Sequence, residues 1–442
     1  MPEPTPRRAA ARTPIEDSRE VERVARAAAA AGLFALDLEF VSESRYLPNL
    51  CLLQLAWGDP EAPEAVLVDP LTADPRPIVE LVADPAVDVV LHSAQGDLAL
   101  LAQRFGIEGR AVWDSQVAAG FLGLGDQVGY AGLVEQLTGT VLDKGAQFTN
   151  WCRRPLSAEQ LRYAVDDVWY LPRMWRELAR RLEERGRLGW VAEESARVAR
   201  VAATRPPPEE MYRRVKGWER LPPEAREAVR ALAAWRERQA LASNKPPQWL
   251  LRDAALLEVA RRRPHTAAEL RHVRGVHADT VRRFGRDLLA VLAEGAEPPE
   301  VPPRRPRLPA EADRWGARLS AFLQERCREA DVAPRFVAAR ADAEALVRWW
   351  VERESEGPPD PAEEPDLPLL SGWRRELAGQ AALQWLAGRH AVAGSEEAEA
   401  TAEGEAAAEG EARRRSGPSG AEAAGEGPAR RRSGGAGRGR GS

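Results

Sequence analysis

The sequence predicts an α/β domain, built on a mixed sheet with flanking helices, followed by two all-α domains and a disordered C-terminal tail. Strand-like alternation of apolar and polar residues occurs up to residue 93, and helical patterns follow it. No strand pattern appears beyond the proline-rich segment 203–211. From Ala393 onward the chain has no large apolar side chain with which to build a core, so this part is expected to be disordered.

The first domain is expected at residues 15–200, behind a disordered leader at 1–14 that is rich in Pro, Arg and Ala. Its first helical pattern ends at Gly32, a residue type favoured just after a helix. A meander of strands followed by helices indicates an α/β or α+β domain with a mixed sheet. The expected elements are a helix at 20–31, strands at 33–41, 49–59, 64–70 and 87–93, a helix at 97–107, and mostly helical chain over 112–182.

The second half of the chain is expected to be helical. A chain of 442 residues is long for one core, since domains usually have about 100–200 residues. The proline-rich segments 203–211 and 297–309 favour extended connections. Helical domains are therefore expected at 212–296 and 310–392. The tail, 393–442, is acidic first and arginine-rich at its end, a composition that allows weak RNA contact or only a solubilising role.

Composition and cysteine usage exclude several classes of protein. No apolar run approaches the roughly 20 residues that a membrane helix needs. The first residues lack the apolar stretch of a signal peptide, which favours a cytoplasmic location. Cys51, Cys152 and Cys327 are far apart and odd in number, which argues against a disulfide framework and against a zinc site. The net charge of −5 gives no general attraction to phosphate, so local patches must decide nucleic-acid binding.

Two carboxylates lie side by side on one face of the strand expected at 33–41. Side chains alternate along a strand, so the apolar Leu36 and Leu38 take one face and Asp37 and Glu39 take the other. Neighbouring carboxylates repel each other, and a divalent cation that prefers oxygen ligands removes this cost. For an isolated Asp-x-Glu pair, however, a solvent-facing strand is the more common explanation.

Two other short patterns carry polar groups suited to the same chemistry. Asp97 stands at the start of the helix expected at 97–107, where a helix-capping role is the usual explanation. Tyr163 and Asp167 are four residues apart in a helix expected to begin near Ser157, so the phenol and the carboxylate face the same way and can reach one water. Each pattern alone is common in unrelated helices.

In their order and context, these elements resemble the three motifs of the DEDDy exonucleases, and most nearly those of the ribonuclease D family. The similarity runs through LDLEFVSESRYLPNLCLLQLA, VLHSAQGDLALL, WDSQVAA, LVEQLTGTVLDK and RPLSAEQLRYAVDDVWYLPRMW. This resemblance implies a ribonuclease-H-like exonuclease fold and two bound divalent cations, Mg²⁺ or Mn²⁺. It also implies a set of catalytic residues, in which Tyr163 joins the four metal ligands Asp37, Glu39, Asp97 and Asp167.

The family's chemistry uses two cations about 4 Å apart, which hold the attacking water and the leaving 3′ oxygen. The resemblance implies that Asp37 bridges the cations and that Glu39 and Asp167 hold the one beside the attacking water. It further implies that Asp97 supports the other cation through water, and that Tyr163 orients the attacking water.

The resemblance also points to three further positions, whose roles are less well defined. His92 either shapes the site and contacts nucleic acid or is a structural histidine, and Asp114 matches a position interpreted as structural. Lys144 is a candidate nucleic-acid contact. After it the chain has GAQFTNW where the family commonly has a polar pattern with an Arg and a carboxylate. We therefore expect a changed RNA affinity or preference, with the metal ligands untouched.

Residues 218–270 resemble an HRDC domain, a helical nucleic-acid-binding module, and residues 367–386 resemble the family's more divergent second copy. The features that match are Leu232, Trp235, Arg236, Asn244 and Pro246. Candidate phosphate contacts are Arg236, Arg238 and Arg252, for which a solvated charged face is the alternative. The tryptophans at 235, 249, 349, 350 and 373 are interpreted mostly as core residues rather than base-stacking platforms.

The expected function is that of a cytoplasmic, monomeric 3′–5′ exoribonuclease that releases 5′-mononucleotides. The expected substrate is RNA with a single-stranded 3′ end, with tRNA precursors first among the candidates that the resemblance implies. A DNA 3′–5′ exonuclease of the same superfamily is one alternative. A non-catalytic nucleic-acid-binding protein is another, and the presence of all four carboxylates with Tyr163 argues against it.

Overall fold

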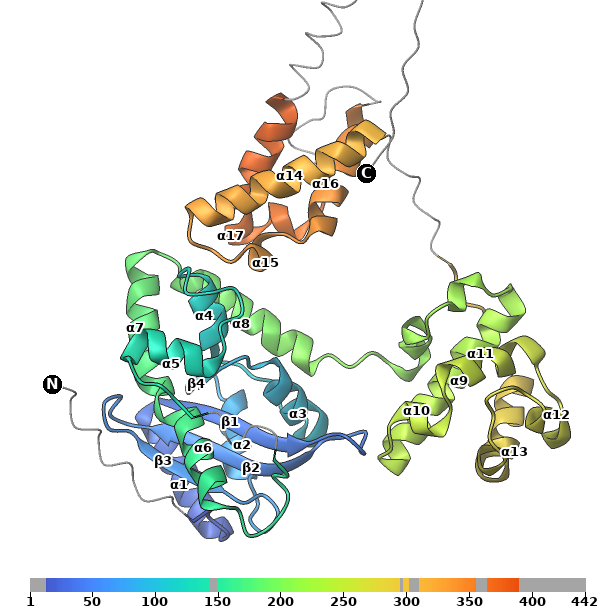
Figure 1. Ribbon diagram of the computed structural model, residues 1–442, viewed down its shortest axis with the longest axis horizontal. Coiled ribbons are helices and arrows are strands. Elements are labelled where there is room, and N and C mark those ends of the chain that lie inside the picture. Colours follow the sequence, from blue (N-terminus) through green and yellow to red (C-terminus); the bar gives the residue numbers. More distant parts are fainter. Residues whose placement is uncertain (1–12, 144–148, 295–296, 302–309, 355–363, 389–442) are drawn as a thin grey trace, which may run out of the picture. The chain divides into compact units, whose positions relative to one another are not determined.

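The computed structural model describes residues 13–143, 149–294, 297–301, 310–354 and 364–388 (Figure 1). Residues up to Gln380 form one compact unit, and residues 381–388, which are helical, belong to a second unit. These ranges leave out most of the expected leader, residues 389–392 at the end of the second expected helical domain, and the whole of the expected tail. No helix among the described residues is long and apolar enough to cross a membrane.

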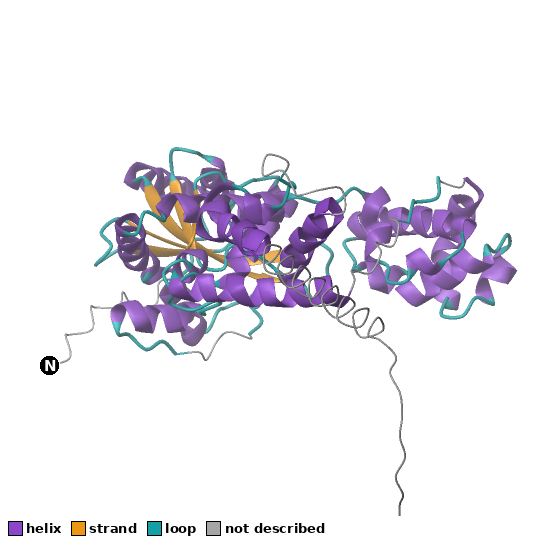
Figure 2. Cartoon of the chain, turned by 90° about the horizontal axis from the view of Figure 1, so that it is seen from above, coloured by secondary structure: helices purple, strands orange, loops and turns teal. Residues whose placement is uncertain are grey.

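A mixed sheet of five strands forms the centre of the first domain (Figure 2). Its order is β3-β2-β1-β4-β5, with β2 antiparallel to both its neighbours and β1, β4 and β5 mutually parallel. The strands are β1 (Leu33–Val41), β2 (Asn49–Trp57), β3 (Glu64–Val68), β4 (Asp88–Leu91) and β5 (Val112–Asp114). The expected mixed sheet is confirmed. The expectation of mostly helical chain from residue 112 was wrong at β5, because three residues are too few to show an alternating pattern.

Helices cover both faces of this sheet. One face packs on α1, α2, α3 and α8 in the main core, and the other packs on α6 in a second core. Gly32, in the left-handed region at φ 74°, ends α1 as the sequence predicted. The helices of this domain are α1 (Ser18–Ala31), α2 (Arg76–Val79), η1 (Glu80–Ala83), α3 (Gln95–Phe105), α4 (Ser115–Gly120), α5 (Tyr130–Thr138), α6 (Ala158–Trp169), α7 (Leu171–Glu184) and α8 (Leu188–Ala203).

The rest of the described chain is helical, as expected. Residues 212–292 share a core in which Leu232 and Leu256 are fully buried, and Asn244, with positive φ, ends α9. The elements there are η2 (Pro208–Arg214), η3 (Trp218–Arg220), α9 (Pro223–Ser243), α10 (Pro247–Leu250), α11 (Asp253–Arg262), α12 (Ala267–Arg271) and α13 (Ala278–Glu294). They are followed by α14 (Ala310–Glu329), α15 (Pro334–Val337), α16 (Arg340–Glu354), η4 (Pro368–Leu370), α17 (Gly372–Arg374) and the π-helical η5 (Arg375–Gly379).

The tryptophans of the helical half behave mostly as core residues, which confirms that interpretation. Trp235, Trp350 and Trp373 are buried, and Trp349 is half-buried. Trp249 differs from them because 64% of its surface is exposed. This indole is therefore available to a partner, whereas the others stabilise the fold.

Candidate active site

Asp37 and Glu39 lie on the face of β1 that α6 covers. Leu36 and Leu38 are buried in the main core on the opposite face, as the alternation predicted. In the ladder, Asp37 stands opposite Gln54 of β2, and the register shifts between Glu39 and the next residue. Such irregularities often adjust the direction of side chains beside functional sites. The pair is half-buried, so the explanation as a solvent-facing strand does not hold.

Helix α6 brings Tyr163 and Asp167 to the same place. Ser157 caps the helix and exchanges hydrogen bonds with Gln160, so the helix begins where the sequence predicted. Ala164 is fully buried against β2 and β3, which fixes the face that α6 turns to the sheet. Tyr163 and Asp167, one turn apart, then lie together at the edge of this contact.

Three carboxylates from these two elements form a tight acidic group. Asp37, Glu39 and Asp167 each offer an oxygen, and these oxygens all lie within 4.8 Å of one another. Burial, the largest cause, raises the pKa of Asp37 to about 7. Burial, followed by the charge of Asp37, raises the pKa of Glu39 to about 9, and burial with both neighbouring charges raises that of Asp167 to about 9. Three ionised carboxylates this close together repel one another when no cation is present, and their oxygens suit hard divalent cations as ligands.

Asp97 reaches the same region from α3. Strand β4 runs parallel to β1, with Val90 beside Ala35, so the turn after β4 lies next to the carboxylates of β1. Burial first, and then the charges of Asp37 and Glu39, raise the pKa of Asp97 well above its ordinary value. Asp97 is outside the group of three. The capping explanation was wrong, because Ala94 is the N-cap of α3 and Asp97 lies in its first turn.

Asp114 holds the turn that presents Asp97. Its carboxylate oxygens accept hydrogen bonds from the backbone N–H groups of Ser93 at 3.0 Å and Ala94 at 2.9 Å. Ser93 has φ 59°, a conformation that a non-glycine residue adopts only when its surroundings hold it there. Asp114 is itself buried and also caps α4. This supports the structural interpretation of Asp114 and shows what it positions.

Tyr163 presents a protonated phenol to the acidic group. Its side chain is hydrogen-bonded to Asp167, and burial, followed by the charges of Asp167 and Glu39, raises its pKa well above the ordinary value. Its ring lies 5.9 Å from that of buried Trp151. A protonated phenol can donate a hydrogen bond to a bound water but cannot act as a base.

A cavity of about 330 Å³ opens beside Tyr163 and Asp167. Gly129 and Gly132 contribute little side-chain bulk to its wall, and Tyr130 lines it from α5. The Tyr130 hydroxyl donates to the backbone carbonyl of Asp166 at 2.7 Å, which ties α5 to α6. Tyr130 was not predicted from the sequence, because no local pattern marks it. The volume falls at the lower end of the about 300–1,000 Å³ typical of ligand pockets.

His92 is held inside the domain. Its Nδ1 lies 2.9 Å from the hydroxyl of Ser115, and its Nε2 lies 3.1 Å from the carbonyl oxygen of Val128. Burial lowers its pKa, which favours the neutral ring. These contacts support the structural alternative, and contact of His92 with nucleic acid stays a prediction.

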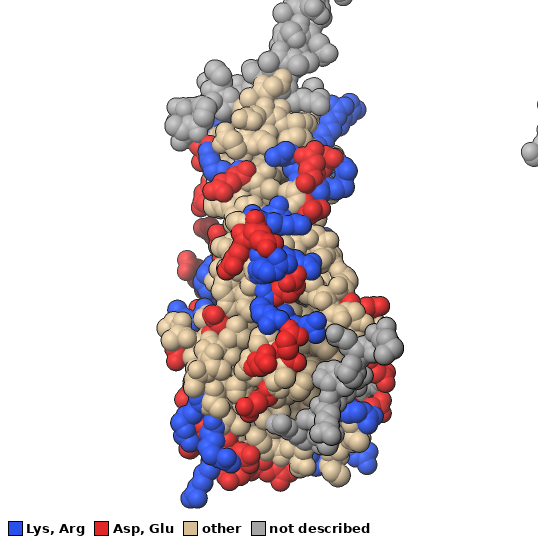
Figure 3. Space-filling model, turned by 90° about the vertical axis from the view of Figure 1, so that its left-hand side faces the viewer, with Lys and Arg blue, Asp and Glu red and all other residues tan. Residues whose placement is uncertain are grey.

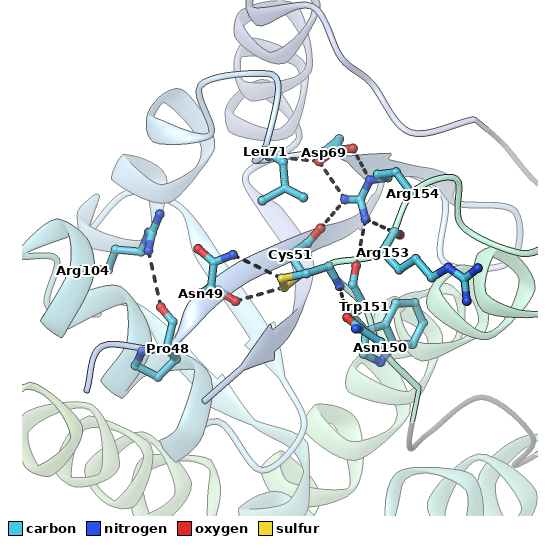
Figure 4. The surroundings of a disulfide bond; sticks show 11 residues. Pro48, Asn49, Cys51, Asp69, Leu71, Arg104, Asn150, Trp151, Arg153 and Arg154 are labelled. Carbon is cyan, nitrogen blue, oxygen red and sulfur yellow. Dashed lines mark hydrogen bonds and ion pairs between the residues drawn. A yellow bond between two sulfur atoms is a disulfide. The ribbon is translucent and has the colours of Figure 1, made fainter. Parts of the chain in front are cut away.

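The segment before α6 is anchored to the sheet by an arginine and a disulfide (Figure 4). The Arg154 guanidinium pairs with buried Asp69 and donates to the Cys51 carbonyl at 2.6 Å. Cys51 and Cys152 form a disulfide, so the argument from spacing against disulfide bonding was wrong for this pair. No local pattern marks this pair, because 101 residues separate the two cysteines. Cys327 is free and buried.

The three arginines expected to contact phosphate have different environments. Arg236 is buried and donates to the Leu251 carbonyl and to Asp253, so it stabilises the helical core. This placement contradicts its prediction as a phosphate contact. Arg238 is exposed and paired with Glu209. Arg252 is exposed beside Trp249. Lys144 lies outside the described residues.

Comparisons with known proteins agree with this geometry. The 3′–5′ exonuclease family matches residues 13–183, and the HRDC domain family matches residues 225–292. Ribonuclease D of Gluconacetobacter diazotrophicus is 40% identical over 367 residues, which are 80% of this chain and 88% of that protein. The chain belongs to the ribonuclease D family. Ribonuclease D of Acidiphilium cryptum is 37% identical over 372 residues, covering 83% of this chain and 90% of the relative.

A solved ribonuclease D structure has the same fold. The crystal structure of Escherichia coli RNase D, described as an exoribonuclease involved in structured RNA processing, matches with a TM-score of 0.69 and 27% identity. The match covers 84% of this chain and 97% of that chain. Membership of the ribonuclease D family makes the chain an enzyme with a 3′–5′ exonuclease domain. The acidic group fits the divalent metals that exonucleases of this kind use.

Proposed function

We propose that this 3′–5′ exoribonuclease of the ribonuclease D family removes nucleotides from single-stranded RNA 3′ ends with two Mg²⁺ or Mn²⁺ ions. The observation that carries the proposal is the acidic group, in which oxygens of Asp37, Glu39 and Asp167 lie within 4.8 Å of one another. A two-metal site first requires several oxygen ligands close together, and this acidic group provides them. The products are 5′-mononucleotides.

The chain's own residues divide the work. When bound, the cations neutralise charge on the scissile phosphate and lower the pKa of a water toward neutrality. Asp37 would help hold both cations, Glu39 and Asp167 would help hold the one beside Tyr163, and Asp97 would support the other through water. The Tyr163 hydroxyl, already hydrogen-bonded to Asp167, orients the attacking water for an in-line displacement.

The cavity beside Tyr163 is suited to the terminal nucleotide. It adjoins the carboxylate group through Asp167 and measures about 330 Å³. Its wall at Gly129 and Gly132 leaves room for a flat ring, and the Tyr130–Asp166 hydrogen bond fixes the wall relative to α6. A 3′ nucleotide seated here places its phosphodiester at the acidic group, as stepwise removal from one end requires.

We propose that the HRDC domain binds the RNA chain at a surface around Trp249, which we call the Trp249 surface. It comprises exposed Trp249, Arg252 and His277 around a hollow of about 520 Å³. An exposed indole beside a cationic side chain supplies base stacking and phosphate attraction together. On the face drawn in Figure 3, basic and acidic side chains are interspersed. Such a mixed face offers no comparable attraction to phosphate.

We propose tRNA precursors as the substrates, a monomer as the working form and the cytoplasm as the location. The length of the single-stranded 3′ trailer then sets how many nucleotides are removed.

Disulfides are rare in the cytosol. Counting free thiols in protein prepared under cytosolic redox conditions tests the location: three reduced thiols support it, and a persistent Cys51–Cys152 bond contradicts it.

The decisive experiment is release of mononucleotides from a tRNA with a 3′ extension. The native chain is compared with Asp37→Asn and with the matched control Glu64→Gln, which changes an exposed carboxylate at the start of β3. We expect metal-dependent release by the native chain and the control, and a loss of about 10³-fold or more in Asp37→Asn, as for removal of a group central to transition-state charge.

A matched DNA strand separates the alternatives. Faster degradation of the DNA than of the RNA would replace the proposed substrate with DNA and leave the metal site intact. Equal activity of Asp37→Asn and the native chain would exclude the acidic group as the catalytic site.

A further inference from the structure

Gln54 lies in the middle of β2, between β1 and β3. In the ladder it stands opposite Asp37 on one side and Leu67 on the other. Directly opposite residues of an antiparallel pair place their side chains on the same face, with Cβ atoms about 4.5–5.5 Å apart. Gln54 therefore belongs to the face that carries Asp37 and Glu39 and that α6 covers.

The side-chain amide of Gln54 is fully buried without a hydrogen-bond partner. Its exposed fraction is 0%, and neither Nε2 nor Oε1 is bonded. Leaving one buried donor or acceptor unsatisfied costs about 1–3 kcal/mol. Among the described residues, Gln54 alone leaves both a donor and an acceptor unpartnered; the other such atoms are single nitrogens of tryptophans and arginines. This group needs an explanation that packing does not give.

The neighbours of Gln54 favour an apolar residue at this position. Leu52, Leu67 and Ala164 are fully buried in the second core on the same face of the sheet. A methionine of similar volume would fill the space with no unsatisfied atom. The polar side chain that the ladder places directly opposite Gln54 is that of Asp37.

We propose that Gln54 is a positioning residue for Asp37, donating from Nε2 to its carboxylate, directly or through one water, when that carboxylate holds a divalent cation. The inference rests on the proposed role of Asp37 as a metal ligand. Ligating carboxylates are themselves hydrogen-bonded, and loss of such a partner typically costs about 10–100-fold in metal affinity. A neutral amide fixes the carboxylate without adding charge to a group that already holds three carboxylates.

The test is Mn²⁺ binding by the full chain, measured by calorimetry and by the electron paramagnetic resonance signal of free Mn²⁺. The variant Gln54→Met keeps the volume and removes the amide. We expect its metal-free melting temperature to equal or exceed that of the native chain, because an unsatisfied group is removed. We expect its Mn²⁺ dissociation constant to rise about 10-fold or more. Leu55→Met, on the opposite face of the same strand, is the matched control and should bind Mn²⁺ as the native chain does.

Gln54→Asn keeps the amide one methylene short and reports on the same question should Gln54→Met fail to fold. We expect a smaller loss of affinity from it than from Gln54→Met. Native Mn²⁺ affinity in every folded Gln54 variant, together with lost binding in Asp37→Asn, would overturn this inference and leave the proposed function standing. Absence of Mn²⁺ binding by the native chain would overturn both.

Discussion

The backbone N–H of Ala94 donates to the buried carboxylate of Asp114 at 2.9 Å, and this bond holds the turn from which α3 presents Asp97. The same carboxylate accepts from Ser93, whose φ of 59° is otherwise unfavourable. Asp97, the proposed metal ligand, thus depends on a second carboxylate that the sequence marked only as structural.

Asp114→Ala is expected to destabilise the domain and weaken metal binding together. Hydrogen bonds to a charged group contribute about 1.5–3 kcal/mol, and the freed N–H of Ala94 stays buried. At about 2–4 °C per kcal/mol, the melting temperature should fall by several degrees. Asp88→Ala, which removes one hydrogen bond to Trp113 from the neighbouring strand, should change it less and leave Mn²⁺ affinity intact. A melting temperature and Mn²⁺ affinity equal to those of the native chain would contradict the assigned role.

Without metal, the protein should lose stability as the pH rises from about 5 to 9. Folding raises the pKa of Asp37 to about 7 and those of Glu39 and Asp167 to about 9, chiefly by burial. A group with a raised folded pKa stabilises the fold below its unfolded pKa, near 4 for these carboxylates, and that stability is lost as pH rises through the folded value. Each such group therefore lowers stability as pH rises, up to about 7 for Asp37 and about 9 for Glu39 and Asp167.

Melting curves in chelator and in Mn²⁺ across this pH range check that prediction. Mn²⁺ should flatten the decline, because the cation replaces the protons. The double variant Glu39→Gln, Asp167→Asn should show a weaker pH dependence in chelator than the native chain. A native chain in chelator that is equally stable at pH 5 and pH 9 would refute it.

Local periods in the sequence predicted which side chains share a face, and the family resemblance predicted that Asp37, Glu39, Asp97 and Asp167 act together. Alternation in β1 separated Asp37 and Glu39 from Leu36, and one helical turn joined Tyr163 to Asp167. Both patterns have a range of four residues or fewer, so the fold merely brought together two faces that were already defined.

The features that sequence reasoning missed depend on contacts between distant segments. Arg154 and Asp69 are 85 residues apart, and Cys51 and Cys152 are 101 apart, so no local period marks either pair. Gln54 did carry a signal, since it is the one polar residue between Leu50 and Trp57 apart from the small Cys51, in a strand buried on both faces. A polar residue within a doubly buried strand calls for a partner, and only the ladder shows that Asp37 stands opposite.

Tyr163→Phe should slow catalysis while metal affinity stays unchanged. The phenol is hydrogen-bonded to Asp167 and is not itself needed as a ligand. Loss of the group that orients the attacking water should lower kcat about 10- to 100-fold. Single-turnover kinetics together with Mn²⁺ titration separate the two effects. An unchanged rate, or a parallel loss of Mn²⁺ binding, would remove Tyr163 from the role of orienting the water.

Arg154→Ala should destabilise the exonuclease domain strongly. It leaves the carboxylate of Asp69, whose side chain is 1% exposed, buried and unpaired, a change that typically costs about 3–5 kcal/mol. The neighbouring Arg153→Ala is the matched control, because that side chain is exposed. Urea unfolding of both variants measures the difference. Equal stabilities would mean that the Arg154–Asp69 pair contributes nothing to anchoring the segment before α6.

Trp249→Ala should weaken RNA binding without lowering stability. The indole is 64% exposed, so its removal leaves the helical core unchanged, whereas stacking of one base on an aromatic ring contributes about 1–3 kcal/mol. The dissociation constant for a single-stranded RNA should therefore rise about 5- to 150-fold.

Arg252→Ala should weaken binding less at high salt than at low salt, since phosphate attraction is screened. Leu241→Ala, another exposed apolar residue of the same domain, is the control and should bind as the native chain does. Fluorescence anisotropy with a labelled RNA measures all three, and native affinity in Trp249→Ala would place the RNA contact elsewhere than on the Trp249 surface.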